Sequence, residues 1–404
     1  MIARETYMAQ IRPFIGKDLI KVLTGIRRSG KSVMLQLIQQ ELIKQGSDPS
    51  QFISLNFEDL TYSRLCTSET LHEEASRRIE AINGKAFLFF DEIQEVVSWE
   101  KCINSLRVKY DCDIYITGSN AKLLSGELAT FLAGRYVEFI IFPFSYSEFR
   151  GSYVEMNPGS SEQEIFNSYS LLGGMPYLSN LAYDYGPSCQ YLQDIFNSVV
   201  LKDIVKRNNV RDIDLLERII GYVFGNIGTT FSAGSIFKYM KSEQRTVSKE
   251  TILNYLKYCE DAFLIYRVPR QDLKGKRLLT INEKYYVADH GLREAVYGGN
   301  LRDINLTLEN ITFLELLRRG YQVTVGKVNE REIDFVCEKQ EKKLYIQAAY
   351  LLASEETINR EFGAYHDIDD NYPKYVVTLD EIEMSRNGIK HRNIRRFLLE
   401  PKWE

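Results

Sequence analysis

The sequence is poor in the residues that build metal centres and covalent cross-links. Its 404 residues include only four histidines, which are dispersed, and six cysteines without a C-x-x-C pair. This spacing argues against a zinc ribbon, a disulfide scaffold and a histidine-based metal site. It favours the reduced thiols of a cytoplasmic protein.

A strong charge of one sign and long apolar segments are also missing. The formal net charge is −4, from 51 basic and 55 acidic residues, so the chain as a whole is not built to coat a polyanion. A local basic surface is still compatible with this balance. No apolar run approaches the ~18 residues that span a bilayer, and the first residues lack an apolar signal core. We therefore expect a cytoplasmic protein of two or three domains without a membrane segment.

What the sequence does contain is one strong motif near its start. The apolar run at 19–23 is typical of a buried parallel strand, and the turn GIRRSGKS follows it at 25–32. Leu35, Ile38 and Leu42 then recur at helical spacing. A turn of the form G-x-x-x-x-G-K-[ST] between a strand and a helix binds nucleotide phosphates. Its glycines let backbone N–H groups approach a phosphate, and the helix N-terminus adds partial positive charge.

We expect this loop to bind Mg-ATP. Lys31 would contact the β- and γ-phosphates, and the hydroxyl of Ser32 would ligate Mg²⁺. A chance match in a basic turn is the alternative, and the flanking strand and helix make it the minor one. The predicted nucleotide-binding residues are Gly25, Ile26, Arg27, Arg28, Ser29, Gly30, Lys31, Ser32 and Val33.

Two acids follow a second apolar strand. Residues 86–90, AFLFF, run directly into Asp91 and Glu92. Such a strand is typical of the centre of a parallel sheet, and open α/β sheets bind ligands at the carboxyl ends of their strands. We predict that Asp91 holds the Mg²⁺ shell and that Glu92 polarises the water that attacks the γ-phosphate. The alternative is an acidic turn without a catalytic role.

Three further polar residues are weaker catalytic candidates. Ser119 and Asn120 follow a predicted strand at 113–117, where either side chain could orient the attacking water or contact the γ-phosphate. A plain turn is the equal alternative. Arg135 precedes a predicted strand at 137–141 and could contact the γ-phosphate within its own chain or in a neighbouring subunit. A surface arginine at a strand start is the alternative.

The rest of the chain is predicted to form three regions after an ATPase domain at 1–155. Residues 151–165 are rich in Gly, Ser, Pro and acids and are predicted to be a linker. A helical lid or linker is predicted at 160–212, a winged-helix-like domain at 213–300 and a small α/β domain at 301–404.

The predicted winged helix ends in a basic hairpin at 267–284. Two short strands are expected, at 264–269 and 285–288. Such a hairpin could follow a DNA or RNA backbone, because each basic contact releases counterions. Docking of a protein partner is an equal interpretation. The basic residues are Arg267, Arg270, Lys274, Lys276, Arg277 and Lys284.

Together these motifs resemble a prokaryotic family of AAA-type P-loop ATPases that carry a C-terminal domain of unknown function. The resemblance implies an α/β core with a parallel sheet, a winged-helix-like middle and a restriction-endonuclease-like end. The matching segments are GIRRSGKS at 25–32, FLFFDEIQ at 87–94, residues 116–136, FPFSYSEF at 142–149, GGMPYL at 173–178, and the C-terminal segments 308–321, 331–336 and 345–352.

The last region departs from the nuclease pattern. Restriction-type nucleases use a helix acid, an aspartate and a strand reading (Asp/Glu)-x-Lys to hold Mg²⁺ and activate water. Glu309 or Glu315 and then Asp334 match the first two parts, but Gln347 and Ala349 stand where a charged ligand and a lysine are required. We therefore expect a nuclease-like fold without nuclease activity.

The expected function is Mg-dependent ATP hydrolysis that drives a switch or motor, with nucleic acid as one candidate partner. The alternative is a nucleotide-gated protein that docks a protein partner, and an ATPase-linked nuclease comes third. The sequence leaves the oligomeric state open.

Overall fold

The computed structural model of the chain consists of two compact units, which we describe separately. The first unit contains residues 1–142 together with the segment 261–263. The second contains residues 143–260 and 264–404. The residues that the structure describes are 2–124, 132, 134–275 and 277–403.

The first unit ends earlier than the predicted ATPase domain, which extended to residue 155. Helix α6 (Tyr146–Met156) belongs to the second unit because it packs against α7 (Glu162–Leu172) and α15 (Ile394–Leu399). The linker predicted at 151–165 is therefore largely helical, and only residues 157–161 separate α6 from α7.

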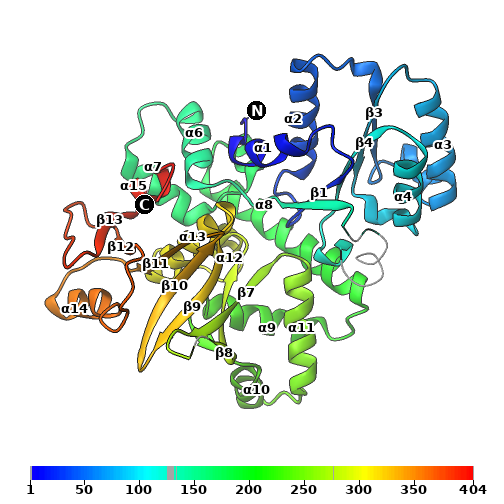
Figure 1. Ribbon diagram of the computed structural model, residues 1–404. Helices are drawn as coiled ribbons and strands as arrows, with labels where there is room; N and C mark the ends of the chain where they lie inside the picture. The colour runs from blue at the N-terminus through cyan, green and yellow to red at the C-terminus, as the bar shows by residue number, and fades with distance from the viewer. Residues whose placement is uncertain (1, 125–131, 133, 276, 404) are drawn as a thin grey trace. The chain divides into compact units, whose positions relative to one another are not determined.

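A five-stranded parallel sheet forms the core of the first unit (Figure 1). This confirms the predicted α/β fold with a parallel sheet. The strand order is β2-β3-β4-β1-β5, so β4 lies between the strand that precedes the phosphate loop and the strand that ends in the two acids. The strands are β1 (Ile20–Thr24), β2 (Phe52–Asn56), β3 (Ala86–Asp91), β4 (Cys112–Thr117) and β5 (Tyr136–Ile140).

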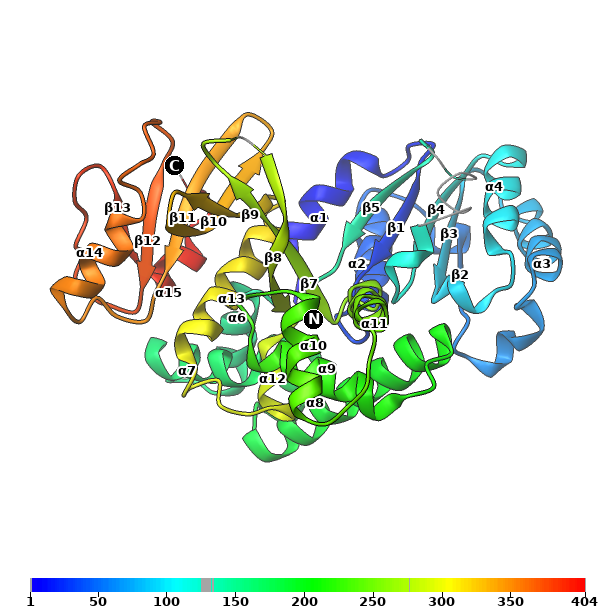
Figure 2. The ribbon, with the colours of Figure 1, turned by 90° about the horizontal axis from the view of Figure 1, so that it is seen from below.

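Helices cover both faces of this sheet (Figures 1 and 2). Helices α3 and α4 pack together on one face, where Leu88 and Phe90 of β3 are buried, and α2 lies on the other. Phe89 points to the opposite side and stacks on Tyr115 at 5.0 Å. Because side chains alternate across a strand, an entirely apolar strand needs this double cover. The helices are α1 (Glu5–Ile11), α2 (Lys31–Lys44), α3 (Ser68–Glu80) and α4 (Trp99–Lys109).

A buried ion pair lies at the amino end of this sheet. Nζ of Lys21 contacts Oδ1 of Asp113, and both side chains are fully buried. The carboxylate of Asp113 also accepts hydrogen bonds from the hydroxyl of Tyr115 at 2.8 Å and from the N–H of Gly16 at 2.7 Å. Burial lowers the pKa of Lys21, although the neighbouring carboxylate opposes this shift. The pair ties β1 to β4 at the end opposite the phosphate loop.

Helices make up the first part of the second unit. The helix α7 ends at Leu172, and Gly173 follows with a φ of 73°. The later elements are η6 (Pro176–Leu181), α8 (Tyr185–Ser198), the π-helical turn η7 (Val199–Lys206), α9 (Ile213–Gly225), α10 (Ala233–Ser242), α11 (Lys249–Asp261), α12 (His290–Val296), α13 (Ile304–Arg318) and α14 (Glu355–Gly363).

One mixed sheet runs through the predicted winged-helix and C-terminal regions. Its strand order is β13-β12-β11-β10-β9-β7-β8-β6, and β7 pairs in parallel with β9. The boundary predicted at residue 300 therefore does not separate two sheets. The strands are β6 (Thr230–Phe231), β7 (Ile265–Asp272), β8 (Arg277–Val287), β9 (Gln322–Val328), β10 (Arg331–Lys339), β11 (Lys342–Ala348), β12 (Lys374–Thr378) and β13 (Lys390–Asn393).

Close backbone contacts explain the glycines of the GGMPYL motif. The N–H of Gly174 donates to Oδ2 of Asp289 at 2.7 Å, and a Cβ on Gly173 would lie 2.1 Å from the other oxygen of this carboxylate. A Cβ on Gly174 would lie 2.2 Å from the carbonyl oxygen of Phe144. Only glycine permits both approaches. Burial raises the pKa of Asp289 to about 6.

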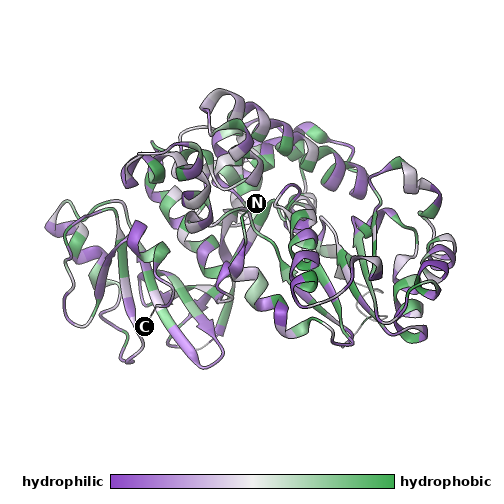
Figure 3. Cartoon of the chain, turned by 90° about the horizontal axis from the view of Figure 1, so that it is seen from above, coloured by the Kyte–Doolittle hydropathy of each residue, from purple (hydrophilic) through white to green (hydrophobic). Residues whose placement is uncertain are grey.

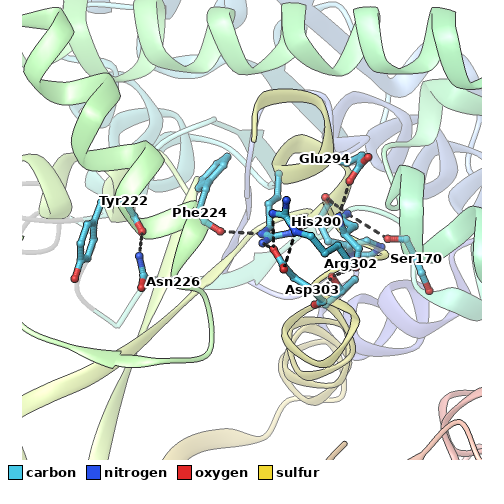
Figure 4. A network of polar contacts seen from close by, with 11 residues as sticks. Ser170, Tyr222, Phe224, Asn226, His290, Glu294, Arg302 and Asp303 are labelled. Carbon is cyan, nitrogen blue, oxygen red and sulfur yellow. Dashed lines mark hydrogen bonds and ion pairs between the residues drawn. The ribbon is translucent and has the colours of Figure 1, made fainter. Parts of the chain in front are cut away.

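Arg293 is a fully buried arginine that joins several elements of the second unit. Figure 4 labels three of the hydrogen-bond acceptors in this network, Phe224, His290 and Asp303. The guanidinium of Arg293 donates to the carbonyl oxygen of Phe224 at 2.8 Å and to the side chains of Asn300 and Asp303, each at 2.7 Å. The amide of Asn300 donates in turn to the carbonyl oxygen of His290 at 2.7 Å. These contacts connect α9, α12 and the loop before α13, and Asp303 supplies a counter-charge for the buried guanidinium.

The distribution of apolar residues follows the two sheets, one in each unit. Figure 3 shows hydrophobic residues concentrated on strands, whereas helices carry both hydrophobic and hydrophilic residues. Within the described residues, no helix combines the length and the apolar character that a membrane crossing requires.

Candidate nucleotide-binding site

The predicted phosphate loop folds tightly between β1 and α2. Gly25 has a φ of 135°, and a Cβ there would lie 2.3 Å from the carbonyl oxygen of Ile141. Gly30 has a φ of 100° and is the N-cap residue of α2, which begins at Lys31. Both positions require glycine, the first for space and conformation and the second for conformation. The loop therefore leads directly into a helix N-terminus, where backbone N–H groups have no helical partners.

Lys31 lies inside this loop. Its Nζ donates to the carbonyl oxygens of Gly25 and Ile26, both at 3.1 Å, and lies 3.9 Å from Oε1 of Glu92. The lysine side chain is only 4% exposed. An ammonium held by loop carbonyls beside a carboxylate is placed to move onto an anion that enters the loop.

The two acids after β3 are brought together by β4. The hydroxyl of Thr117 donates to Oδ1 of Asp91. The hydroxyl oxygen of Thr117 also accepts a hydrogen bond from the N–H of Glu92 at 2.9 Å. Glu92 has a φ of 54°, a left-handed conformation that is uncommon outside glycine. Thr117 therefore fixes both the Asp91 side chain and the strained main chain of Glu92.

The remaining loop residues differ in exposure. The guanidinium of Arg27 donates to Oε1 of Glu58 at 2.8 Å and is largely buried. Arg28, Ser32 and Val33 are exposed, which leaves the first turn of α2 accessible. The glycine geometry, the helix N-terminus, Lys31 and the exposed Ser32 hydroxyl together fit a bound nucleotide, and Ser32 and Asp91 are oxygen donors of the kind that Mg²⁺ prefers.

Ser119 and Asn120 lie at the carboxyl end of β4, as predicted, and both are buried. Leu23 pairs with Thr117, and the N–H of Gly118 donates to the carbonyl oxygen of Leu23 at 3.1 Å. The sheet order thus puts this turn between the phosphate loop and the two acids.

Arg135 does not join the site in its own chain. Its carbonyl oxygen accepts the N–H of Ile20 at 2.9 Å, and Tyr136 pairs with Ile20 at the amino end of β1. The phosphate loop begins after Thr24, about 13 Å farther along the strand at ~3.3 Å per residue. The predicted contact of Arg135 with the γ-phosphate of its own chain is therefore wrong. The parallel register places Arg135 at the amino ends of the strands, whereas the phosphate loop lies at their carboxyl ends.

Three residues that the sequence motifs do not single out also shape the site. Thr117 ends a predicted strand, and Gln94, which donates through Nε2 to Oε2 of Glu92, lies within the segment FLFFDEIQ at 87–94. Arg4 is 2% exposed and donates to the carbonyl oxygens of Ser29 at 2.9 Å and Phe142 at 2.8 Å, so it braces the loop from outside. The threonine and glutamine stand next to predicted residues, but nothing near Arg4 signals its role.

Comparison with known proteins agrees with this geometry. Residues 17–150 match the AAA domain family, and residues 163–303 match a domain of unknown function, DUF8612. An uncharacterized protein of Haemophilus influenzae is 39% identical over 378 residues, which cover 94% of this chain and 93% of that protein. The uncharacterized protein MJ1544 of Methanocaldococcus jannaschii is 32% identical over 363 residues, which cover 86% and 78%. The chain belongs to their family, and it is an AAA-domain protein.

The fold of this AAA-domain protein is also found in a solved structure. The Walker-type ATPase PABY2304 of Pyrococcus abyssi superimposes with a TM-score of 0.53 at 16% identity. The match covers 73% of this chain and 96% of that one. It shows a shared P-loop ATPase fold.

The basic hairpin of the AAA-domain protein is less available to a polyanion than predicted. Lys284 is buried, while Arg267 contacts Glu260 and Glu283, and Arg270 contacts Glu332 at 3.3 Å. Pairing of β7 with β9 gives the hairpin a neighbour on each side, so its strands extend beyond the predicted ranges. Lys274 and Arg277 are exposed, and Lys276 lies outside the described residues.

Lys284 is instead the centre of an acidic cluster in the C-terminal region. Its Nζ lies 2.8 Å from Glu309, 3.0 Å from Glu332 and 3.1 Å from Asp334. Burial raises the pKa of Glu309 to about 7, while Lys284 opposes that shift. The cluster borders an open groove of about 680 Å³.

This cluster tests the nuclease residues predicted from the sequence. Glu309 and Asp334 come together, but Glu315 does not, because it pairs with Arg318 and Arg319. Gln347 accepts the N–H of Asp334 at 2.6 Å and donates to Glu361 at 3.1 Å. Over the described part of the chain, no group of three Cys, His, Asp or Glu side chains is arranged to hold a metal ion.

Proposed function

We propose that this AAA-domain protein binds Mg-ATP at residues 25–33 and hydrolyses it. The observation that carries the proposal is the meeting of Lys31, Asp91 and Glu92 at the carboxyl ends of β1 and β3, with Thr117 of β4 linking the two acids. Parallel α/β sheets bind ligands at this edge. The family relationship to AAA-domain proteins supports the same conclusion.

The loop residues bind and orient the triphosphate. Backbone N–H groups between Gly25 and Gly30 and at the start of α2 would surround the phosphates. Lys31 would leave the loop carbonyls for the β- and γ-phosphate oxygens, and Ser32 and Asp91 would hold the metal ion. Bound Mg²⁺ supplies charge neutralisation at the phosphoryl group.

Glu92 acts as the base in this proposal. Its carboxylate would accept a proton from the attacking water, and departure of Lys31 toward the phosphates would release Oε1 from its present neighbour. Ser119 and Asn120, buried between the loop and the acids, would contact that water or the γ-phosphate.

We propose that nucleotide turnover works as a switch or motor in the cytoplasm. All six cysteines are free thiols, as a reducing compartment requires. Action on nucleic acid through the hairpin is supported by the exposed Lys274 and Arg277. The burial of Lys284 and the ion pairs of Arg267 and Arg270 favour the second candidate, nucleotide-gated docking of a protein partner. Residues 213–300 and 301–404 are proposed to be a winged-helix-like and a degenerate restriction-endonuclease-like region that share one sheet.

Nucleotide affinity and turnover of two variants test the ATPase. Lys31→Ala should bind ATP far more weakly than the wild type, because it loses the buried ammonium of the loop. Glu92→Gln should bind ATP normally and hydrolyse it roughly a hundredfold more slowly. Arg77→Ala, on the exposed face of α3, is the control. Normal turnover by Glu92→Gln would remove that residue from the mechanism.

A further inference from the structure

We propose that Gln94 is a positioning residue for hydrolysis, which holds the carboxylate of Glu92 in the orientation from which it acts on water. This inference rests on the proposed function of Glu92. Gln94 lies in η4 (Ile93–Glu95), the 3-10 turn that directly follows Glu92. Its Nε2 donates to Oε2 of Glu92.

The turn that carries Gln94 is firmly held. Ile93 is fully buried, and the N–H groups of Glu95 and Val96 donate to the carbonyl oxygens of Glu92 and Ile93 at 3.1 and 3.0 Å. Thr117 binds the main-chain N–H of Glu92, and among the hydrogen bonds of the described residues none joins Thr117 to the Glu92 carboxylate. The main chain and the side chain of the base are therefore positioned by different residues.

The surroundings of the other carboxylate oxygen of Glu92, Oε1, show why the hydrogen bond from Gln94 is needed during hydrolysis. Oε1 of Glu92 lies 3.9 Å from Nζ of Lys31. When Lys31 moves to the phosphates, as proposed, that contact is lost. Among the contacts of the described residues, the bond from Gln94 is then the one that still orients the carboxylate.

The tip of β4 confines the amide of Gln94. A Cβ on Gly118 would lie 2.8 Å from Oε1 of Gln94 and 2.8 Å from Cδ2 of Leu123, although the φ of Gly118 is not in the left-handed region. This glycine is thus required for space rather than conformation. A side chain at this position would therefore press on the amide of Gln94 and on Leu123, which gives a second way to disturb Gln94 without removing it.

The buried amide of Gln94 would lower the stability of the fold if it had no other role. Its Oε1 is buried, and none of the residues that the structure describes donates a hydrogen bond to it. Burial of a carbonyl without a donor is unfavourable, and such groups in folded proteins call for an explanation. Orientation of Glu92 by the other end of the amide provides one.

Loss of this hydrogen bond should slow chemistry without weakening substrate binding. A catalytic group displaced by about 1 Å typically loses about 100-fold in rate. We expect Gln94→Met, which keeps the length of the side chain but has no N–H donor, to lower kcat about 10- to 100-fold. The KM and the Kd for ATP should stay unchanged, because the contacts that Gln94 makes are with Glu92 and the tip of β4. Gln94→Glu should be at least as slow, since it places a second carboxylate against Glu92.

The test measures kcat, KM, the Kd for ATP and the thermal midpoint of the full-length variants. Glu95→Gln, an exposed change in the same turn, is the matched control and should behave as the wild type. Gly118→Ala should reproduce the loss in kcat by displacing the amide, which keeps the test valid if a Gln94 variant fails to fold. In the Glu92→Gln background, Gln94→Met should cause no further loss, because a residue that acts through Glu92 has nothing left to position.

Two results would overturn the inference. One is a normal kcat for Gln94→Met, and the other is an undiminished loss in the Glu92→Gln background, which would indicate a purely structural role. These outcomes are distinct from failure of the proposed function. Normal hydrolysis by Glu92→Gln refutes the function, whereas slow hydrolysis by that variant together with normal Gln94→Met refutes only the role of Gln94.

Discussion

Replacement of Lys284 by methionine should destabilise the second unit by about 3–5 kcal/mol. The lysine side chain is 3% exposed, and its Nζ lies within 3.1 Å of Glu309, Glu332 and Asp334. Methionine preserves much of the apolar stem but removes the ammonium. Three buried or partly buried carboxylates then face one another without their counter-ion, and removal of one partner from such a cluster is strongly unfavourable.

Glu309 gives this prediction a pH dependence. Burial raises its pKa from 4.5 to about 7, and Lys284 holds it below the value that burial alone would give. Between these two pH values the unfolded chain has released the proton and the folded chain retains it. Stability therefore falls as pH rises through this window, by about 3 kcal/mol for a shift of this size. Without Lys284 the pKa of Glu309 rises further, so Lys284→Met should be more destabilised at pH 8 than at pH 5.

Urea unfolding followed by tryptophan fluorescence measures this effect. In a Trp99→Phe background the signal comes from Trp403, which stacks on Phe397 at 4.2 Å in the second unit. Lys274→Met, an exposed change in the same hairpin, is the control. Lys284→Met combined with Glu309→Met should recover part of the loss, because apolar replacement of a whole buried pair is often nearly neutral. A destabilisation below about 1 kcal/mol at both pH values would refute the reasoning, since it would mean that the ammonium does not compensate the acids.

Three other predictions concern the partners and the remaining chemistry. Arg135→Ala should hydrolyse ATP as the wild type does, because the register of β5 places it away from the loop. A severe loss that is restored by mixing with Lys31→Ala protein would instead show that it acts in a neighbouring subunit. Charge reversal of the exposed Lys274 and Arg277 should leave ATP hydrolysis intact. A flattened salt dependence of DNA or RNA binding in that variant would reinstate nucleic acid as the ligand of the hairpin. With Mg²⁺ or Mn²⁺, the protein should not cleave labelled single- or double-stranded substrates, and cleavage that disappears in Asp334→Ala would contradict the degenerate site.

The strand–loop–helix of the phosphate site could be predicted from the sequence because its determinants are local. The apolar run before Gly25, the glycines of the loop and the periodic residues of α2 all lie within about 25 consecutive positions. Likewise, an apolar strand that ends in Asp91 and Glu92 indicates a central parallel strand without any knowledge of its neighbours. Four strands of this sheet, predicted at 19–23, 86–90, 113–117 and 137–141, follow from such local patterns, and so do the two acids.

Only the tertiary structure decided which distant residues meet. Thr117 contacts Asp91 and Glu92 because β4 lies next to β3. Arg135 lies outside the nucleotide site because the parallel register of β5 places it at the amino ends of the strands. The sequence places Lys284 among six basic residues of a hairpin, yet the pairing of β7 with β9 buries it against acids that lie 25 to 50 positions later. Hydrophobic periodicity determines which elements form, whereas strand order and register are set by packing between segments far apart in the chain. Strand order and register, rather than the local motifs, thus determine which residues surround Glu92 and which basic residues of the hairpin are buried or paired.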